Sequence, residues 1–140
     1  MPGASFTVAA PAGPRSMAPG GATRTFARRA EEVPAARRFV RDVLAGHPGC
    51  YDAELLTCEL VTNAVQHATG AARVTVALMR LGAVVHVDVI DDGCIGMPHW
   101  REACGHDEDG RGFQLVDALA ERWGFHRERS GTCVWFEIAP

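Results

Sequence analysis

Lysine is absent from this sequence, and all 14 of its basic side chains are arginines. A Walker A phosphate loop requires a lysine, so that class of nucleotide site is excluded. The arginines are outnumbered by 17 acidic residues, which leaves a net charge of −3. A general nucleic-acid-binding surface needs an excess of positive charge to neutralise phosphates, so direct nucleic-acid binding is not expected either.

Long apolar segments and a cysteine framework are missing as well. The longest hydrophobic runs are only as long as a strand, and no basic head precedes an apolar block as in a secretory signal. The five cysteines are odd in number and form no CxxC pair. These absences favour free thiols in a reducing compartment, so we expect a cytoplasmic protein without a membrane segment.

The composition that remains is typical of one globular domain. Hydrophobic residues make up 47% of the 140 residues and charged residues 22%, as in an ordinary soluble domain with a hydrophobic core. Residues 1–22 are rich in Ala, Pro, Gly and Ser and show no hydrophobic periodicity, which predicts a disordered leader. A single folded domain over residues 23–140 is therefore expected.

The spacing of apolar residues predicts two kinds of element. Helical spacing predicts three helices, over residues 31–45, 52–68 and 113–122. Short apolar segments, most of them alternating with polar residues, predict five strands, over residues 23–26, 74–78, 85–89, 123–127 and 133–138. The first strand is expected at an edge of the sheet, and the second and third form an antiparallel hairpin. Together these elements predict an α+β fold, a two-layer sandwich with helices on one face of a mostly antiparallel sheet.

The second predicted helix carries Glu59 and Asn63 four residues apart on its polar side. Side chains with this spacing are stacked neighbours on a helix. An amide oxygen can bind Mg²⁺ and a carboxylate can take a proton from a nucleophile, so the pair suits a nucleotide phosphate site. The same pattern also fits a plain solvated helix face, and the pair alone does not decide between the two.

Asp91 follows the predicted strand over residues 85–89 and shares a face with its alternating valines. If that face meets the helices, the carboxylate lies between the layers and needs a hydrogen-bond donor. An adenine amino group is a donor that fits, and Gly93 and Gly96 would permit close approach of the backbone to a flat ring. Asp-Asp-Gly is also common turn chemistry, so a simple turn is the alternative.

Gly110, Arg111 and Gly112 come immediately before the last predicted helix. Free N–H groups at a helix N-terminus, with an arginine beside them, form a site for an anion such as phosphate. The acidic run over residues 107–109 would have to point outward, and the segment over residues 97–109 would be a mobile cover. A flexible connection into the helix is the alternative interpretation.

Taken in order, these segments resemble the motifs of the GHKL (Bergerat) ATPases. Glu59–Ala68 looks like the N-box, Asp91–Pro98 like the first glycine box, and Gly110–Gly124 like the second. Gly131–Glu137 resembles the closing Gly-Thr strand of that family. The resemblance covers residues 24–138, and within the superfamily the chain is most similar to the single-domain anti-sigma-factor serine/threonine kinases and their actinobacterial relatives.

The resemblance implies a Bergerat ATP-binding fold that uses ATP together with Mg²⁺. It implies that Glu59 is the general base and that Asn63 is the Mg²⁺ ligand. The other implied nucleotide contacts are Asp91 at the adenine amino group, Gly93 and Gly96 along the ring, Gly110, Arg111 and Gly112 at the phosphates, and Thr132 near the adenine. Alternation agrees for Thr132, because it lies on the apolar face of the last strand.

Two functions follow from this resemblance. The first is an anti-sigma factor that phosphorylates a serine of a STAS-type anti-anti-sigma protein and otherwise sequesters a sigma factor; a homodimer is compatible with it. The second is a non-catalytic interaction module in which ATP is a regulatory ligand. A separate alternative is a zinc site formed by Cys94, His99, Cys104 and His106, although their spacing matches no familiar zinc finger.

Overall fold

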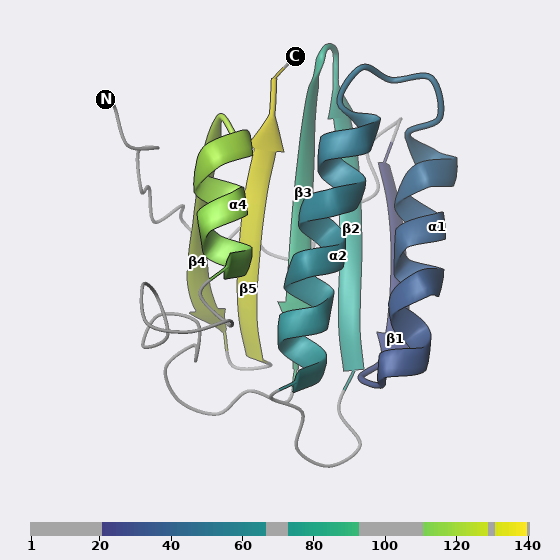
Figure 1. Ribbon diagram of the computed structural model, residues 1–140, viewed down its shortest axis with the longest axis vertical. Coiled ribbons are helices and arrows are strands. Elements are labelled where there is room, and N and C mark those ends of the chain that lie inside the picture. The colour runs from purple at the N-terminus through teal and green to yellow at the C-terminus, as the bar shows by residue number, and fades with distance from the viewer. Residues whose placement is uncertain (1–20, 67–72, 93–110, 129–130, 140) are drawn as a thin grey trace.

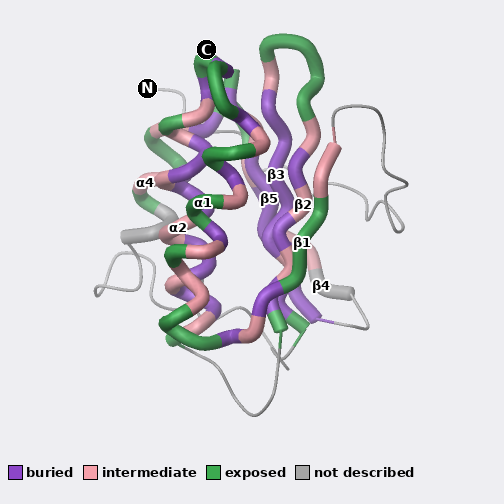
Figure 2. Tube along the Cα trace, turned by 90° about the vertical axis from the view of Figure 1, so that its right-hand side faces the viewer, coloured by how far each residue is buried: buried purple, intermediate pink, exposed green. Residues whose placement is uncertain are grey.

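A computed structural model describes residues 21–66, 73–92, 111–128 and 131–139, and it shows one sheet beneath one layer of helices (Figures 1 and 2). The sheet has five strands in the order β1-β2-β3-β5-β4. The bounds of the strands are β1 Gly21–Ala27, β2 Arg73–Leu81, β3 Val84–Asp91, β4 Arg122–Glu128 and β5 Gly131–Ile138. All four neighbouring pairs are antiparallel. The predicted α+β sandwich is confirmed, and β1 is an edge strand as expected.

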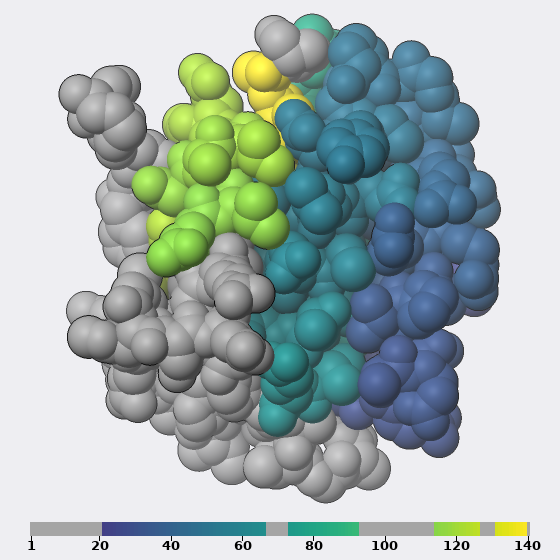
Figure 3. All heavy atoms as spheres, in the orientation of Figure 1, coloured from purple at the N-terminus to yellow at the C-terminus, as the bar shows by residue number. Residues whose placement is uncertain are grey.

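The helical elements are a short 3₁₀ helix η1 and the helices α1, α2 and α4, which lie side by side over one face of the sheet (Figure 3). Their bounds are η1 Ala30–Glu32, α1 Val33–Val43, α2 Cys50–Gln66 and α4 Arg111–Leu119. These bounds differ from the predicted ones by a few residues. Pro34 stands in the first turn of α1, where a residue without an N–H is tolerated. Helix α2 starts earlier than Asp52, because the Ala53 N–H already donates to the Gly49 carbonyl.

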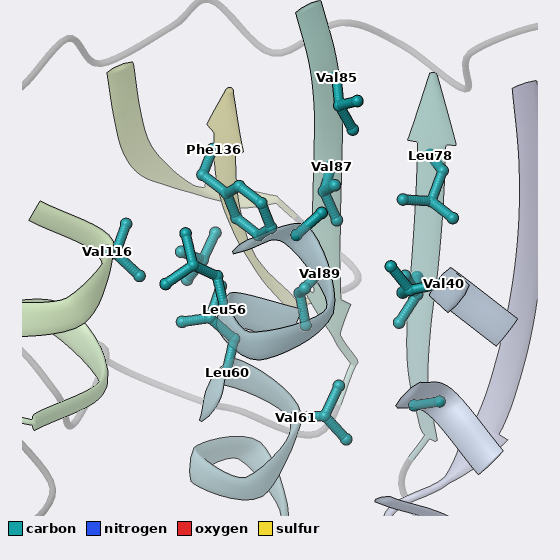
Figure 4. Packing of buried hydrophobic residues seen from close by; sticks show 14 of the residues in the cluster. Val40, Leu56, Leu60, Val61, Leu78, Val85, Val87, Val89, Val116 and Phe136 are labelled. Carbon is teal, nitrogen blue, oxygen red and sulfur yellow. The ribbon is translucent and has the colours of Figure 1, made fainter. Parts of the chain in front are cut away.

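The hydrophobic core fills the space between the two layers. The alternating valines of β3 face the helices, and Val87 lies opposite Phe136 of β5. Leu56 and Leu60 of α2 point into the same space, where Phe136 and Val89 of the sheet also lie (Figure 4). Because α2 packs over the centre of the sheet, burial of these side chains fixes the height and direction of the helix that carries Glu59 and Asn63.

Charged side chains join α1 to α2 near the surface. Glu54 of α2 accepts hydrogen bonds from Arg37 and Arg41 of α1, with Nη2–Oε1 distances of 3.0 and 2.7 Å. The hydrogen bond from Arg41 is the main reason that the pKa of Glu54 lies below its usual value, despite the opposing effect of burial. Arg37 and Arg41 of α1 are about half exposed and also hold the adjacent helix.

Among the helices of the described segments, none is both long and apolar enough to cross a membrane.

Candidate functional site

The elements that carry the described candidate residues converge at one end of the two-layer structure, the lower end in Figure 1. Helix α2 runs down to Gln66 at this end, where β1 and β3 end and β5 begins. The antiparallel pairing produces this convergence, because it places the end of one strand beside the start of its neighbour, as in the pairs Ala27–Arg73 and Asp91–Thr132. Segments that are far apart in the sequence therefore share one edge of the fold.

Asp91 and Thr132 are directly opposite each other in the register of β3 and β5. Both residues lie on the face that the helices cover, and their exposed fractions are only 2% and 0%. The alternation of the sequence predicted this face for both residues. Asp92, which points to the other side, accepts a hydrogen bond from the Arg73 N–H at 2.6 Å and is exposed. The chain thus delivers one carboxylate between the layers, and the next one ties the end of β3 to the start of β2.

Gly131 makes the close approach of these two strands possible. Its φ of +147° lies in the region that side-chain-bearing residues rarely adopt. A Cβ atom at this position would lie 1.9 Å from the carbonyl oxygen of Asp91. Only glycine can therefore place Thr132 beside Asp91 without moving the backbone. This is a steric reason for the Gly-Thr pair that opens β5.

Glu59 and Asn63 occupy the last two turns of α2. Asn63 is buried, with an exposed fraction of 4%, and its Nδ2 makes no hydrogen bond. Glu59 is partly exposed. The helical wheel placed both on one polar face, but the structure separates them: Asn63 turns inward, whereas Glu59 stays accessible to solvent. A buried amide and an accessible carboxylate one turn apart can serve different parts of one polar ligand.

Arg28, which follows β1, is the site residue that the sequence analysis missed. Its side chain is 1% exposed, and its Nη1 lies 3.1 Å from Oδ1 of Asp91. Its Nε and Nη2 both donate to the carbonyl oxygen of Ala64, at 3.2 and 3.0 Å. Arg28 lies outside every periodic segment and every motif, so no local pattern indicated its burial.

Several buried polar atoms at this end of the fold lack a hydrogen bond. They are Nη1 of Arg28, Nδ2 of Asn63 and Oγ1 of Thr132. The contact of Nη1 with Asp91 is close enough for an ion pair, but it is not aligned as a hydrogen bond. Buried polar groups are normally satisfied, so unsatisfied ones close together indicate the place of a polar ligand or ordered water.

Comparison with known proteins agrees with this geometry. A family model of the histidine kinase-like ATPase domain matches residues 24–138. This chain belongs to that family. Among curated proteins, none matches the chain. The match begins within β1 and extends to the end of β5. It confirms the resemblance at the level of the GHKL superfamily; the anti-sigma subgroup remains a prediction.

Membership in the histidine kinase-like ATPase domain family implies ATP binding, and the described residues fit that ligand. The Asp91 carboxylate can accept a hydrogen bond from an adenine amino group. The Thr132 hydroxyl opposite it makes no hydrogen bond and can therefore bond to a ligand. Asn63 can supply an amide oxygen, a ligand type that Mg²⁺ accepts together with nucleotide phosphates. Among the described residues, no group of three His, Cys, Asp or Glu side chains could hold a metal by itself.

The glycine motifs of the ATPase domain are only partly visible. Arg111 and Gly112 form the first turn of α4, so this helix starts two residues before the predicted Phe113. The first turn is where backbone N–H groups lack partners within the helix, so the backbone of both residues stays compatible with the predicted anion site. The remaining predicted residues lie outside the described residues: Gly93, Gly96 and Gly110 of the glycine boxes, and Cys94, His99, Cys104 and His106 of the zinc alternative.

A second polar cluster of the ATPase domain lies on the opposite face of the sheet. His86 contacts Oε2 of Glu137 through Nδ1 at 2.9 Å and Oδ1 of Asp88 through Nε2 at 3.1 Å. Its ring stacks on Trp135 with the centroids 5.6 Å apart. Burial raises the pKa of Glu137, but hydrogen bonds from His86 and Arg122 outweigh it and leave the pKa below its usual value. Strand alternation separates this cluster from Asp91, so it is not part of the candidate site.

Proposed function

We propose that this protein is an anti-sigma factor with serine/threonine kinase activity that uses Mg²⁺ and ATP. Its substrate would be a serine of a STAS-type anti-anti-sigma protein, and its other partner a sigma factor. The observation that carries the ATP part is the meeting of Asp91, Thr132 and Asn63 at one end of the fold, where buried polar atoms remain without hydrogen bonds. The kinase part depends on Glu59, and the partners depend on the resemblance of the motifs.

The described residues would share the chemistry as follows. Asp91 and Thr132 bind the adenine, and Asn63 contributes an oxygen ligand to Mg²⁺, which neutralises phosphate charge when it is bound. Glu59, one turn earlier and still accessible, takes the proton from the serine hydroxyl of the substrate. The serine oxygen then forms a bond to the γ-phosphorus while the bond from this phosphorus to the bridging oxygen breaks and ADP leaves.

Calorimetric titration of the full chain with ATP tests the binding part, with and without Mg²⁺. We expect micromolar-range binding that needs Mg²⁺ and Asn63, and that weakens in Asp91→Asn. Asn63→Ala should abolish the effect of Mg²⁺ rather than the fold, because its amide forms no hydrogen bond through Nδ2. A folded protein that binds no ATP would contradict the ATP-binding part of the proposal, and the kinase part with it.

Phosphorylation assays test the kinase part. Purified STAS-domain proteins from the same organism are incubated with the protein and Mg²⁺-ATP, and phosphoserine is measured by mass spectrometry. We expect transfer to one of them by the wild type and at least a 100-fold slower transfer by Glu59→Gln with unchanged ATP affinity. Binding of ATP without transfer to any STAS protein would instead favour the non-catalytic module, in which ATP controls a protein contact.

A further inference from the structure

Arg28 joins three segments of the chain inside the fold. It follows β1, its Nε and Nη2 donate to the Ala64 carbonyl of α2, and its Nη1 contacts the Asp91 carboxylate at the end of β3. A guanidinium that is 99% buried is costly unless its charge is paired and its N–H groups are used. The ion pair with Asp91 and the two hydrogen bonds to Ala64 offset part of this cost.

The contact with Ala64 holds the last described turn of α2. Both Nε and Nη2 of Arg28 donate to the Ala64 carbonyl oxygen, at 3.2 and 3.0 Å. Ala64 directly follows Asn63, so Arg28 fixes the turn of α2 that presents the predicted Mg²⁺ ligand.

The contact with Asp91 acts on the residue that is predicted to bind the adenine amino group. The Asp91 side chain is 3% exposed, and burial disfavours its charged form unless a positive charge is near. Only the ionised carboxylate is purely a hydrogen-bond acceptor, which is what an adenine amino group requires. The Arg28 guanidinium supplies that positive charge. Its Nη1 lies 3.1 Å from Oδ1, one of the two oxygens of the Asp91 carboxylate.

We propose that Arg28 is a positioning residue for base recognition: it holds the Asp91 carboxylate ionised and oriented toward the adenine amino group, and it fixes the turn that carries Asn63. This inference rests on the proposed ATP binding and goes beyond it, because it names a residue outside all four motifs as the source of selectivity for adenine. Arg28 touches no substrate atom in this proposal; it acts through Asp91 and Ala64.

The test compares ATP with purine riboside triphosphate, which lacks only the 6-amino group. Affinities are measured by calorimetry with Mg²⁺ for the wild type, Arg28→Met and Arg29→Met. We expect the wild type to prefer ATP about ten-fold or more, as for one hydrogen bond to a charged acceptor. In Arg28→Met this ratio should fall close to one. Arg29 is the adjacent, exposed arginine, so Arg29→Met should keep the wild-type ratio.

The ratio separates positioning from a purely structural role. If Arg28→Met weakened the binding of both nucleotides equally, the arginine would only support α2, and the proposal would be overturned. A higher preference for ATP in that variant would also overturn it, because Arg28 would then compete with adenine for Asp91. An unchanged ratio has the same consequence.

A second variant covers the case in which Arg28→Met does not fold. Arg28→Lys keeps the charge, but one ammonium cannot reproduce the fork that serves Ala64 and Asp91 together. We expect its preference for ATP to drop by about threefold or more, and an unchanged preference would overturn the proposal. A wild type that binds neither nucleotide contradicts the proposed function, whereas a selective wild type with equally selective variants contradicts only this inference.

Discussion

Asp91 and Thr132 face each other across β3 and β5, both buried beneath the helices, with a carboxylate on one strand and an unpartnered hydroxyl on the other. An unsatisfied buried hydroxyl lowers stability, and a bound polar ligand can supply the missing hydrogen bond. The predictions below separate what these residues do for the fold from what they do for the ligand.

Gly131→Ala should destabilise the protein strongly. The added Cβ would clash with the Asp91 carbonyl oxygen, and the backbone is already at a φ of +147°. We expect a loss of about 3 kcal/mol in the free energy of unfolding, measured by urea denaturation. Gly82→Ala is the matched control, since its φ is +66° but no atom lies within 4 Å of the new Cβ; it should cost only about 1 kcal/mol. Equal losses in both variants would contradict the steric explanation.

Thr132→Val should separate stability from binding. Valine keeps the branched shape and removes only the hydroxyl that forms no hydrogen bond, so we expect stability to rise by about 1 kcal/mol. ATP affinity should fall by about ten-fold in calorimetry, because the hydroxyl contacts the nucleotide in the proposed site. Thr57→Val removes a second buried and unpartnered hydroxyl, earlier in α2. That control should leave ATP affinity unchanged, and a loss of affinity there would count against the assignment of Thr132.

Asn63→Leu should make the nucleotide-free protein slightly more stable. The substitution replaces a buried amide whose Nδ2 has no partner with an apolar side chain of similar size, and we expect a gain of about 1 kcal/mol in thermal denaturation. The increase in ATP affinity caused by Mg²⁺ should disappear. Glu59→Gln, on the preceding turn, should retain that increase. A stable Asn63→Leu protein that still binds ATP in a Mg²⁺-dependent way would remove Asn63 from the site.

Glu54→Gln should alter how stability depends on pH. The pKa of Glu54 is lowered in the folded state, chiefly by the hydrogen bond from Arg41, so the ionised group stabilises the fold above its unfolded pKa of about 4.3. This contribution is lost as the pH falls through the lower, folded pKa. Since both arginines are about half exposed, we expect the variant to lose only about 1 kcal/mol at pH 7.

The difference between wild type and Glu54→Gln should shrink when the pH is lowered below about 4. Urea denaturation at several pH values checks this, with Glu31→Gln as the control because Glu31 is exposed and forms none of these bonds. High salt should reduce the difference at pH 7 as well. A difference that stays constant from pH 7 to pH 3 would show that the carboxylate charge is not what holds α1 to α2.

The sequence determined the fold class and the faces of its elements, because both follow from local spacing. Alternation in β3 and β5 is a property of a few consecutive residues, and it correctly placed Asp91 and Thr132 on the helix side. The predicted ends of the elements were less accurate than their faces. Helix α4 starts at Arg111 rather than at Phe113, because the N–H groups of a first turn have no partner within the helix and the start of a helix is therefore weakly marked in the sequence.

Only the tertiary structure decided which distant groups meet. The ion pair of Arg28 with Asp91 spans 63 positions of the sequence, and the two hydrogen bonds of Arg28 to Ala64 span 36. Asn63 and Glu59 share a helix face in the sequence pattern, yet only Asn63 is buried. Periodicity reports which side of an element is apolar. The partner of a buried charge depends on how the strands and helices pack together, and no local spacing encodes that.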